Sequence, residues 1–191
     1  MKRILIATGV LTAVSLATAA PASADTVRHR DAAHDVVKFD GDRETTVPAV
    51  TEGDVRRVTV AHTSGRLVVK LKYAELSRTN RWVAVALVRT SAGKEFEVAL
   101  VASSRIGWQG KLTVSRAGGS VVACPGADRK VDYAVNTVRF SVPRGCVGDP
   151  RWVKVGVAHV RFVSEFRIFG DDAFSATVGN DLAFTRRLYR A

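Results

Sequence analysis

The stretch DVRRVTVAHTSGRLVVKLKY, residues 54–73, carries the pattern that decides the fold. Apolar side chains occupy every second position on both sides of Thr63-Ser64-Gly65, as Val58 and Val60 do before it and Leu67 and Val69 do after it. Alternation with period two places successive side chains on opposite faces of a β-strand. A short segment of small polar residues between two such runs is typical of a hairpin turn. The stretch therefore predicts two antiparallel strands joined by a tight turn.

Further short strand-like segments follow along the chain. They are 82–88, 95–102, 111–115, 120–124, 130–134, 137–142 and 152–163. Segment 82–88 is almost wholly apolar, which predicts a strand covered on both faces. Single helical turns are expected only at 73–77 and 171–174, because no segment shows the sustained spacing of an amphipathic helix. The sequence thus predicts an all-β domain over 47–191, a single antiparallel β-sandwich of which a jelly roll is one arrangement.

The first 24 residues have the features of a cleaved signal peptide. Lys2 and Arg3 supply a positive start, an apolar run follows, and Ala22-Ser23-Ala24 gives the small-x-small pattern of a cleavage site. The run is shorter than the roughly 20 apolar residues that span a bilayer, so no transmembrane anchor is expected. We expect the chain to be secreted, with residues 25–46 forming a polar N-terminal arm that holds one short strand near 36–39.

Cys124 and Cys146 are the only two cysteines. Thiols oxidise outside the cytosol, so a lone pair in an exported protein predicts one disulfide. Their wide spacing does not fit a Cys-x-x-Cys redox or zinc pair, and a cysteine nucleophile would need an unpaired thiolate beside a histidine. A disulfide closing this loop would stabilise the fold by about 3.5 kcal/mol in the chain-entropy treatment.

The chain is strongly basic, with a formal charge of +11 at pH 7. A basic exterior attracts anionic cell-envelope polymers or lipid headgroups without a special pocket. The alternative is a solvated basic surface, since arginine is also enriched for codon reasons in genomes of high GC content. We expect an anionic cell-envelope polymer or a glycan as partner, and we do not expect nucleic acid.

No residue spacing typical of an enzyme occurs. The histidines are His29, His34, His62 and His159. The sequence has no Gly-x-Ser-x-Gly elbow, glycine-rich phosphate loop or metal-binding histidine pair, so a non-enzymatic protein is favoured. A secreted hydrolase is the alternative, and it requires His62 or His159 to meet a carboxylate such as Asp54 or Asp171 in a cleft.

Two weaker patterns suggest binding sites. Acidic residues near glycines are candidate calcium ligands, because calcium takes six to eight oxygens and tolerates irregular loops. These residues are Asp40, Asp42, Asp54, Asp171 and Asp172. Their spacing does not match an EF-hand, and aspartate with glycine is also ordinary turn chemistry, so a calcium-stabilised interaction domain stays an alternative.

The three tryptophans differ in their surroundings. Trp82 and Trp152 stand inside apolar runs and are expected in the core. Trp108 lies in the expected loop 105–110, where an exposed ring could stack on a sugar or pack over the end of the sandwich. Trp108 is therefore the candidate ligand-binding aromatic.

Three longer motifs carry a resemblance. They are GDVRRVTVAH at 53–62, VVACPGADRKVDYAVNTVRFSVPRGCVGDPRWVKVGV at 121–157, and FTRRLYR at 184–190. Over most of the exported chain they resemble a group of small secreted actinobacterial β-sandwich proteins. The resemblance implies export, a β-sandwich and one disulfide, and it implies no activity. Together these patterns predict a secreted, non-enzymatic binding or envelope-associated module.

Overall fold

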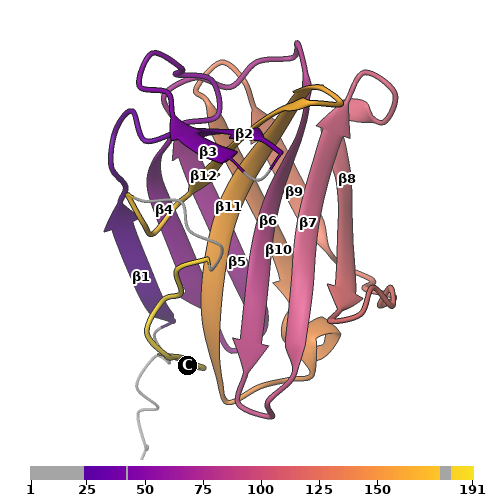
Figure 1. Ribbon diagram of the computed structural model, residues 1–191. Coiled ribbons are helices and arrows are strands. Elements are labelled where there is room, and N and C mark those ends of the chain that lie inside the picture. The colour runs from indigo at the N-terminus through magenta and orange to yellow at the C-terminus, as the bar shows by residue number, and fades with distance from the viewer. Residues whose placement is uncertain (1–23, 42, 177–181) are drawn as a thin grey trace, which may run out of the picture.

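The computed structural model describes residues 24–41, 43–176 and 182–191. Within these ranges the chain forms β-strands and one short 3-10 helix (Figure 1). No helix in the described part of the chain is long and apolar enough to cross a membrane. The predicted signal peptide, apart from Ala24, lies outside the described residues.

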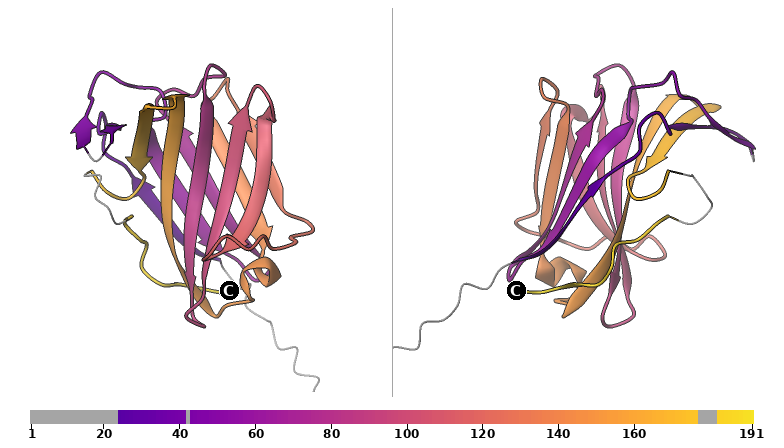
Figure 2. Two further views of the ribbon diagram at one scale, coloured as in Figure 1. Left: turned by 45° about the vertical axis from the view of Figure 1, so that its right-hand side comes forward. Right: turned by 90° about the vertical axis from the view of Figure 1, so that its left-hand side faces the viewer.

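Two antiparallel sheets pack against each other (Figures 1 and 2), which confirms the predicted sandwich. The five-stranded sheet has the order β1-β4-β5-β10-β9. Its strands are β1 (Asp25–Arg30), β4 (Val55–His62), β5 (Arg66–Tyr73), β9 (Asp128–Asp132) and β10 (Thr137–Pro143). The eight-stranded sheet has the order β3-β2-β12-β11-β6-β7-β8, with β13 paired to β11. Its strands are β2 (Val37–Asp40), β3 (Arg43–Thr46), β6 (Arg81–Thr90), β7 (Glu95–Ser103), β8 (Gly107–Arg116), β11 (Trp152–Ser164), β12 (Arg167–Asp172) and β13 (Leu188–Tyr189).

The stretch 54–73 folds as its alternation predicts. Leu67, Val69 and Leu71 of β5 are buried, whereas Lys70 and Lys72 between them are exposed. The β4–β5 turn closes where the backbone N–H of Thr63 donates to Arg66 O at 2.9 Å. The inward side chains of this hairpin meet those of the facing sheet and form one core. The core residues of the facing sheet include Trp82, Ala84, Ala86, Val98, Leu100, Val155 and Val157.

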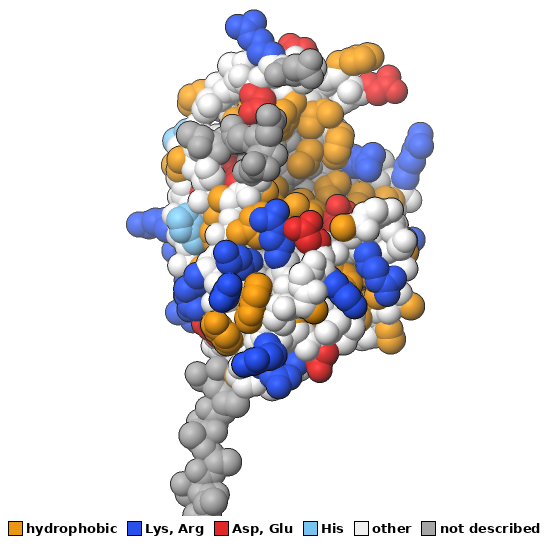
Figure 3. All heavy atoms as spheres, turned by 60° about the horizontal axis from the view of Figure 1, so that its bottom comes forward, with side chains coloured by type: hydrophobic (Ala, Val, Ile, Leu, Met, Phe, Trp, Pro, Cys, Tyr) orange, Lys and Arg blue, Asp and Glu red, His pale blue; other side chains and the backbone are white. Residues whose placement is uncertain are grey.

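Strand β6 is fully covered on its inner face and only partly on its outer face, which corrects in part the prediction for residues 82–88. Trp82, Ala84, Ala86 and Val88 point into the core, whereas Val83, Val85 and Leu87 on the outer face are partly buried. Figure 3 shows hydrophobic side chains on this outer face in the upper half of the view. The C-terminal residues cover the neighbouring β11 instead, where a Cβ added at Gly156 would lie 2.7 Å from Leu182 Cδ2. An all-apolar segment does not by itself reveal which neighbour covers its outer side.

Several local predictions need correction. Segment 120–124 makes only an isolated bridge between Val121 and Ser115, because Gly118 and Gly119, both with positive φ, turn the chain sharply just before it. The turns expected to be helical at 73–77 and 171–174 begin inside strands β5 and β12, and the short helix η1 (Arg144–Val147) lies elsewhere. Residues 25–46 hold three strands, β1, β2 and β3, rather than the single expected one.

The segment 182–191, called here the C-terminal strap, closes one side of the sandwich. Leu188 is fully buried, and β13 pairs with Trp152 and Val153 of β11. The backbone N–H of Tyr189 donates to Asp25 Oδ2 at 2.9 Å, which ties the strap to β1 in the other sheet. The strap thus joins the edges of both sheets.

The disulfide between Cys124 and Cys146 confirms the predicted pairing, with the two Cα atoms 5.4 Å apart. It ties the segment that follows β8 to the helix η1 that follows β10. This bond therefore fastens the side of the sandwich opposite β1 and the strap (Figure 1).

Replacing both cysteines, Cys124→Ala with Cys146→Ala, should lower the free energy of unfolding by about 3.5 kcal/mol, because the unfolded chain regains the freedom that the closed loop removes. Urea unfolding followed by tryptophan fluorescence measures the change. A reductant should produce a similar loss in the parent chain and none in the double variant. Equal stability of the two chains in the absence of reductant would contradict this role of the bond.

Candidate functional site

Five buried aspartates gather where the two sheets meet beside β1, and we call them the carboxylate cluster. They are Asp31, Asp35, Asp54, Asp171 and Asp172. Asp31 and Asp35 follow β1, Asp54 precedes β4, and Asp171 and Asp172 end β12. The cluster therefore combines three segments that lie far apart in the sequence.

Three of these carboxylates converge closely. One oxygen from each of Asp31, Asp35 and Asp171 lies within 4.8 Å of the others. Asp171 Oδ2 also accepts the backbone N–H of Val55 at 2.6 Å, so β12 of one sheet is bonded to β4 of the other. Asp54 lies next to this contact, where its Oδ2 is 3.0 Å from Arg56 Nη2. The geometry is a small group of oxygens held rigidly between two sheets.

Half of the cluster's ten carboxylate oxygens have no hydrogen-bond donor among the described residues. Among the described residues none donates to Asp31 Oδ2, to either oxygen of Asp35, to Asp54 Oδ1 or to Asp171 Oδ1. Asp172 differs, because its two oxygens accept the N–H groups of Phe174 and Ala183. Asp172 thus holds the C-terminal strap, while the other four carboxylates present free oxygens.

Burial changes the acidity of the cluster. Loss of hydration raises the pKa of Asp31 to about 8, and the charges of Asp171 and Asp35 add to the rise. Loss of hydration likewise raises the pKa of Asp171 to about 8, although the N–H of Val55 acts in the opposite direction. The pKa values of Asp35 and Asp172 are also raised, and loss of hydration is again the main cause. Without a counter-charge, the cluster therefore holds protons near neutral pH.

The structure brings together three of the five predicted calcium ligands. Asp54, Asp171 and Asp172 belong to the cluster, whereas Asp40 is exposed on β2 and pairs with Lys38 at 3.1 Å. Asp42 lies outside the described residues. Sequence reasoning missed Asp31 and Asp35, which have no neighbouring glycine; the usable signal was a carboxylate next to the apolar pair Val36-Val37.

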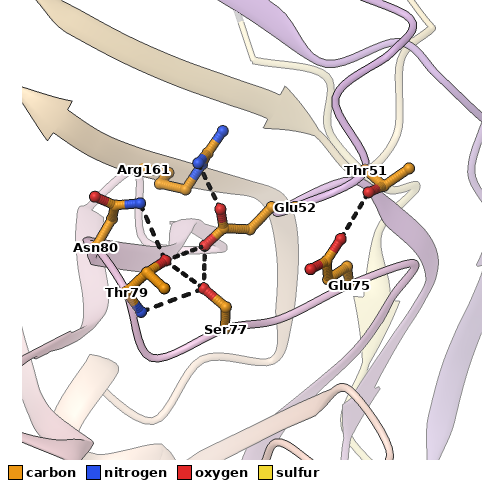
Figure 4. Close-up of polar contacts among 7 residues, drawn as sticks. All are labelled: Thr51, Glu52, Glu75, Ser77, Thr79, Asn80 and Arg161. Carbon is orange, nitrogen blue, oxygen red and sulfur yellow. Dashed lines mark hydrogen bonds and ion pairs between the residues drawn. The ribbon is translucent and has the colours of Figure 1, made fainter.

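A second polar network fixes the loop that leads to Asp54 (Figure 4). Glu52 pairs with Arg161 of β11, whose Nη1 lies 2.5 Å from Glu52 Oε2, and it accepts hydrogen bonds from Ser77 and Thr79. The next residue, Gly53, has φ +87, and a Cβ added there would lie 2.8 Å from the ring of His159. The loop is thus held from both sides, which positions Asp54.

The two strand histidines do not form a catalytic pair with a carboxylate. His62 is fully buried, with Nδ1 2.9 Å from Leu188 O in the strap. His159 lies opposite Asp171 in the β11–β12 register, but no hydrogen bond joins the two among the described residues. The ring of His159 packs against those of Tyr73 and Trp82, and burial lowers its pKa to about 3. Neither histidine provides the accessible base that the hydrolase alternative requires.

The tryptophans are placed differently from the prediction in two respects. Trp82 is buried as expected, but Trp152 is only half-buried, with the guanidinium of Arg187 4.6 Å from its ring centre. Trp108 lies in β8 rather than in a loop, and it is half-buried against the core. It borders a hollow of about 350 Å³ at one end of the sandwich, together with Arg81 and Ile106. Its ring has both a packing role and an exposed edge.

The outer surface of the five-stranded sheet carries two rows of cations, and we call it the basic face. Residues directly opposite one another on paired strands share a face of the sheet. The first row across the strands is Arg28, Thr59, Lys70, Arg139 and Lys130. The second row is Arg30, Arg57, Lys72, Thr137 and Asp132.

Few acids neutralise the basic face. Arg139 pairs with Asp128 at 3.2 Å, but within the described ranges Arg28, Arg57 and Lys70 make no ion pair. A hollow of about 380 Å³ lies between these last three residues and Lys72. Like charges directly opposite each other weaken a sheet, and Lys70 with Arg139, like Arg57 with Lys72, is such a pair. The basic face therefore concentrates uncompensated positive charge on a rigid surface.

Comparison with known proteins adds no relative. No protein-family model matches the chain, and neither a curated protein nor a solved structure is significantly similar to it.

Removing the carboxylate of Glu52 by Glu52→Ala should lower the free energy of unfolding by about 2–3 kcal/mol, because it leaves the mostly buried guanidinium of Arg161 without its partner. Glu75→Ala is the matched control, since Glu75 is exposed and accepts one hydrogen bond from Thr51. This control should cost less than about 1 kcal/mol. Urea unfolding of both variants checks the difference, and equal losses would contradict it.

The carboxylate cluster should make stability fall as pH rises in buffer without divalent cations. The folded pKa values of Asp31 and Asp171, about 8, lie above the ordinary aspartate value of 3.8, so the folded state binds more protons between about pH 4 and pH 8. The free energy of unfolding should therefore decrease across this window by a few kcal/mol. Urea titrations at several pH values measure it, and Asp171→Asn should flatten the curve. A stability that increases across the window would refute the expectation.

Proposed function

We propose that the protein is a secreted, non-enzymatic binding module that holds an anionic polymer of the cell envelope on its basic face. The observation that carries this proposal is the pair of cation rows across β1, β4, β5, β10 and β9. On this face Arg28, Arg57 and Lys70 make no ion pair among the described residues, and the paired strands hold them at fixed positions.

The arrangement suits a repeating anion. Neighbouring strands are about 4.8 Å apart, and residues two positions apart along a strand are separated by about 6.8 Å. Cations at such spacings can contact several charged groups of one extended polymer at the same time. A bound polymer would also relieve the repulsion between Lys70 and Arg139 and between Arg57 and Lys72, since each cation would gain an opposite charge. Binding of this kind weakens with salt, because the charges are exposed.

The proposals of secretion and of a non-catalytic role are supported by separate observations. The signal-peptide pattern of residues 1–24 supports export, and the disulfide is compatible with an oxidising compartment. Burial of His62 and His159 removes the residues on which the hydrolase alternative depends. A binding role does not require His62 or His159 to take part in a reaction.

The double change Arg57→Gln with Lys70→Gln should weaken binding to polyphosphate by about tenfold, because each exposed ion pair contributes up to about 1 kcal/mol. The matched control is Lys111→Gln with Arg116→Gln, which removes the same charge from exposed positions on β8 of the other sheet. Fluorescence anisotropy with labelled polyphosphate at rising salt measures both, with neutral dextran as the uncharged probe.

The control pair should lower the affinity by less than about threefold, since long-range attraction alone is screened at physiological ionic strength. Equal weakening by the two pairs would show that net charge, rather than the basic face, determines binding. Tighter binding to duplex DNA than to polyphosphate would contradict the choice of an envelope polymer. Retention on neutral dextran that salt does not affect would contradict the electrostatic basis.

A further inference from the structure

We propose that the carboxylate cluster binds one calcium ion, with Asp31, Asp35 and Asp171 as its side-chain ligands. The proposal is independent of the basic face, which lies on the outside of the five-stranded sheet, whereas the cluster lies between the sheets.

The first argument is the number of buried oxygens without a donor. Asp35 is only 6% exposed and Asp171 only 3%, yet both oxygens of Asp35 and Oδ1 of Asp171 lack a partner among the described residues. Buried polar atoms in folded proteins are nearly always hydrogen-bonded, and a burial without compensation is costly. Oxygens from three carboxylates that converge within 4.8 Å are best explained by a cation that all three contact.

The second argument is the balance of charge around the cluster. Arg56 forms an ion pair with Asp54 and also attracts the carboxylate of Asp35 electrostatically, and His29 does the same for Asp172. Five carboxylates therefore face one permanent cation, and this cation is already bonded to Asp54. A divalent ion would supply the missing positive charge at the point where Asp31, Asp35 and Asp171 meet.

The third argument concerns the identity of the ion. All the converging ligands are carboxylate oxygens, which hard cations prefer, whereas zinc favours nitrogen and sulfur. Calcium binds oxygens at about 2.3–2.6 Å, so two ligands on opposite sides of it lie about 4.6–5.2 Å apart. Magnesium requires shorter bonds and near-ideal octahedral geometry. Three aspartates from an irregular loop and a strand end fit calcium better.

The position gives the ion a structural role. Asp31 and Asp35 belong to the segment that leads from β1 in one sheet to β2 in the other, and Asp171 is on β12 beside β2. An ion bound by all three would fasten the sheets together on the side opposite the disulfide. Calcium should therefore raise the stability of the whole sandwich.

A proton shared among the carboxylates would also relieve their repulsion. Calcium titration distinguishes a shared proton from a bound calcium ion. The full secreted chain is first treated with a chelator and then titrated with calcium chloride in a calorimeter, with magnesium chloride as comparison. We expect one calcium per chain and weaker binding of magnesium. At about 100 times the dissociation constant, calcium should raise the melting temperature by roughly 5–10 °C. No heat and no thermal shift with calcium would overturn the proposal.

Variants in which asparagine replaces an aspartate of nearly the same shape test where the calcium ion binds. Asp35→Asn and Asp171→Asn should each lower calcium affinity at least tenfold and remove most of the thermal shift. Without calcium, Asp35→Asn should melt higher than the parent chain, because one buried negative charge is gone. Asp40→Asn is the matched control: its carboxylate is exposed, and its calcium response should be unchanged. A calcium shift that survives both cluster variants would place the ion elsewhere and refute the assignment.

Terbium, which replaces calcium at oxygen sites, gives a test that does not depend on variant folding. Asp171 is hydrogen-bonded to the backbone of Val55, which lies opposite the buried Tyr73 in the β4–β5 register, so Tyr73 lies near the cluster. Ultraviolet excitation of the parent protein should sensitise terbium emission, and added calcium should displace it. Tyr73→Phe should reduce the emission without abolishing terbium binding measured by calorimetry. Emission that calcium cannot displace would count against the site.

Discussion

Packing of alternate side chains across the space between the two sheets is the interaction on which the rest of the molecule depends. Leu67, Val69 and Leu71 fill one side of this space, and Trp82 and its neighbours on β6 fill the other. Because only every second side chain of a strand points into the core, the side chains between them point outward and need not be apolar. On the five-stranded sheet these outward side chains form the basic face. On strand β6 of the eight-stranded sheet they include the apolar Val83 and Val85.

A sandwich of two sheets has two open sides, and this chain closes them by different means. A covalent bond between Cys124 and Cys146 closes one side. The C-terminal strap and the carboxylate cluster close the other, where Asp171 accepts a hydrogen bond from Val55 across the sheets. Burying several carboxylates at such a position weakens the fold unless something compensates for their charge. The cost suggests a ligand, whereas a purely structural closure would have used apolar side chains.

The sequence predicted the parts of the fold that depend on local alternation. The hairpin of residues 54–73 and strand β10 follow directly from side-chain periodicity, and the disulfide follows from a lone pair of cysteines in a chain expected to be exported. The prediction of a strand over 120–124 was wrong because the segment pairs with the end of β8 for only a few residues, through the bridge at Val121 and the hydrogen bond from Val122 N–H to Val114 O. The carboxylate cluster was predicted in part, since Asp54 and Asp171 were named for their glycine neighbours. Asp31 and Asp35 were not, because their convergence depends on how β1 and β12 meet, which no local pattern records.

The contact between Asp25 and the strap has a consequence for how the chain folds. The carboxylate of Asp25 is bonded to Arg186, at 2.7 Å, and to the backbone of Tyr189, so the first strand is secured by almost the last residues of the chain. Contacts of such long sequence separation form late and slow folding. β1 can pair with β4 early in synthesis, but its contact with the strap can form only after residues 186–189 have left the ribosome. The side of the sandwich at β1 therefore stays open until almost the whole chain has been made.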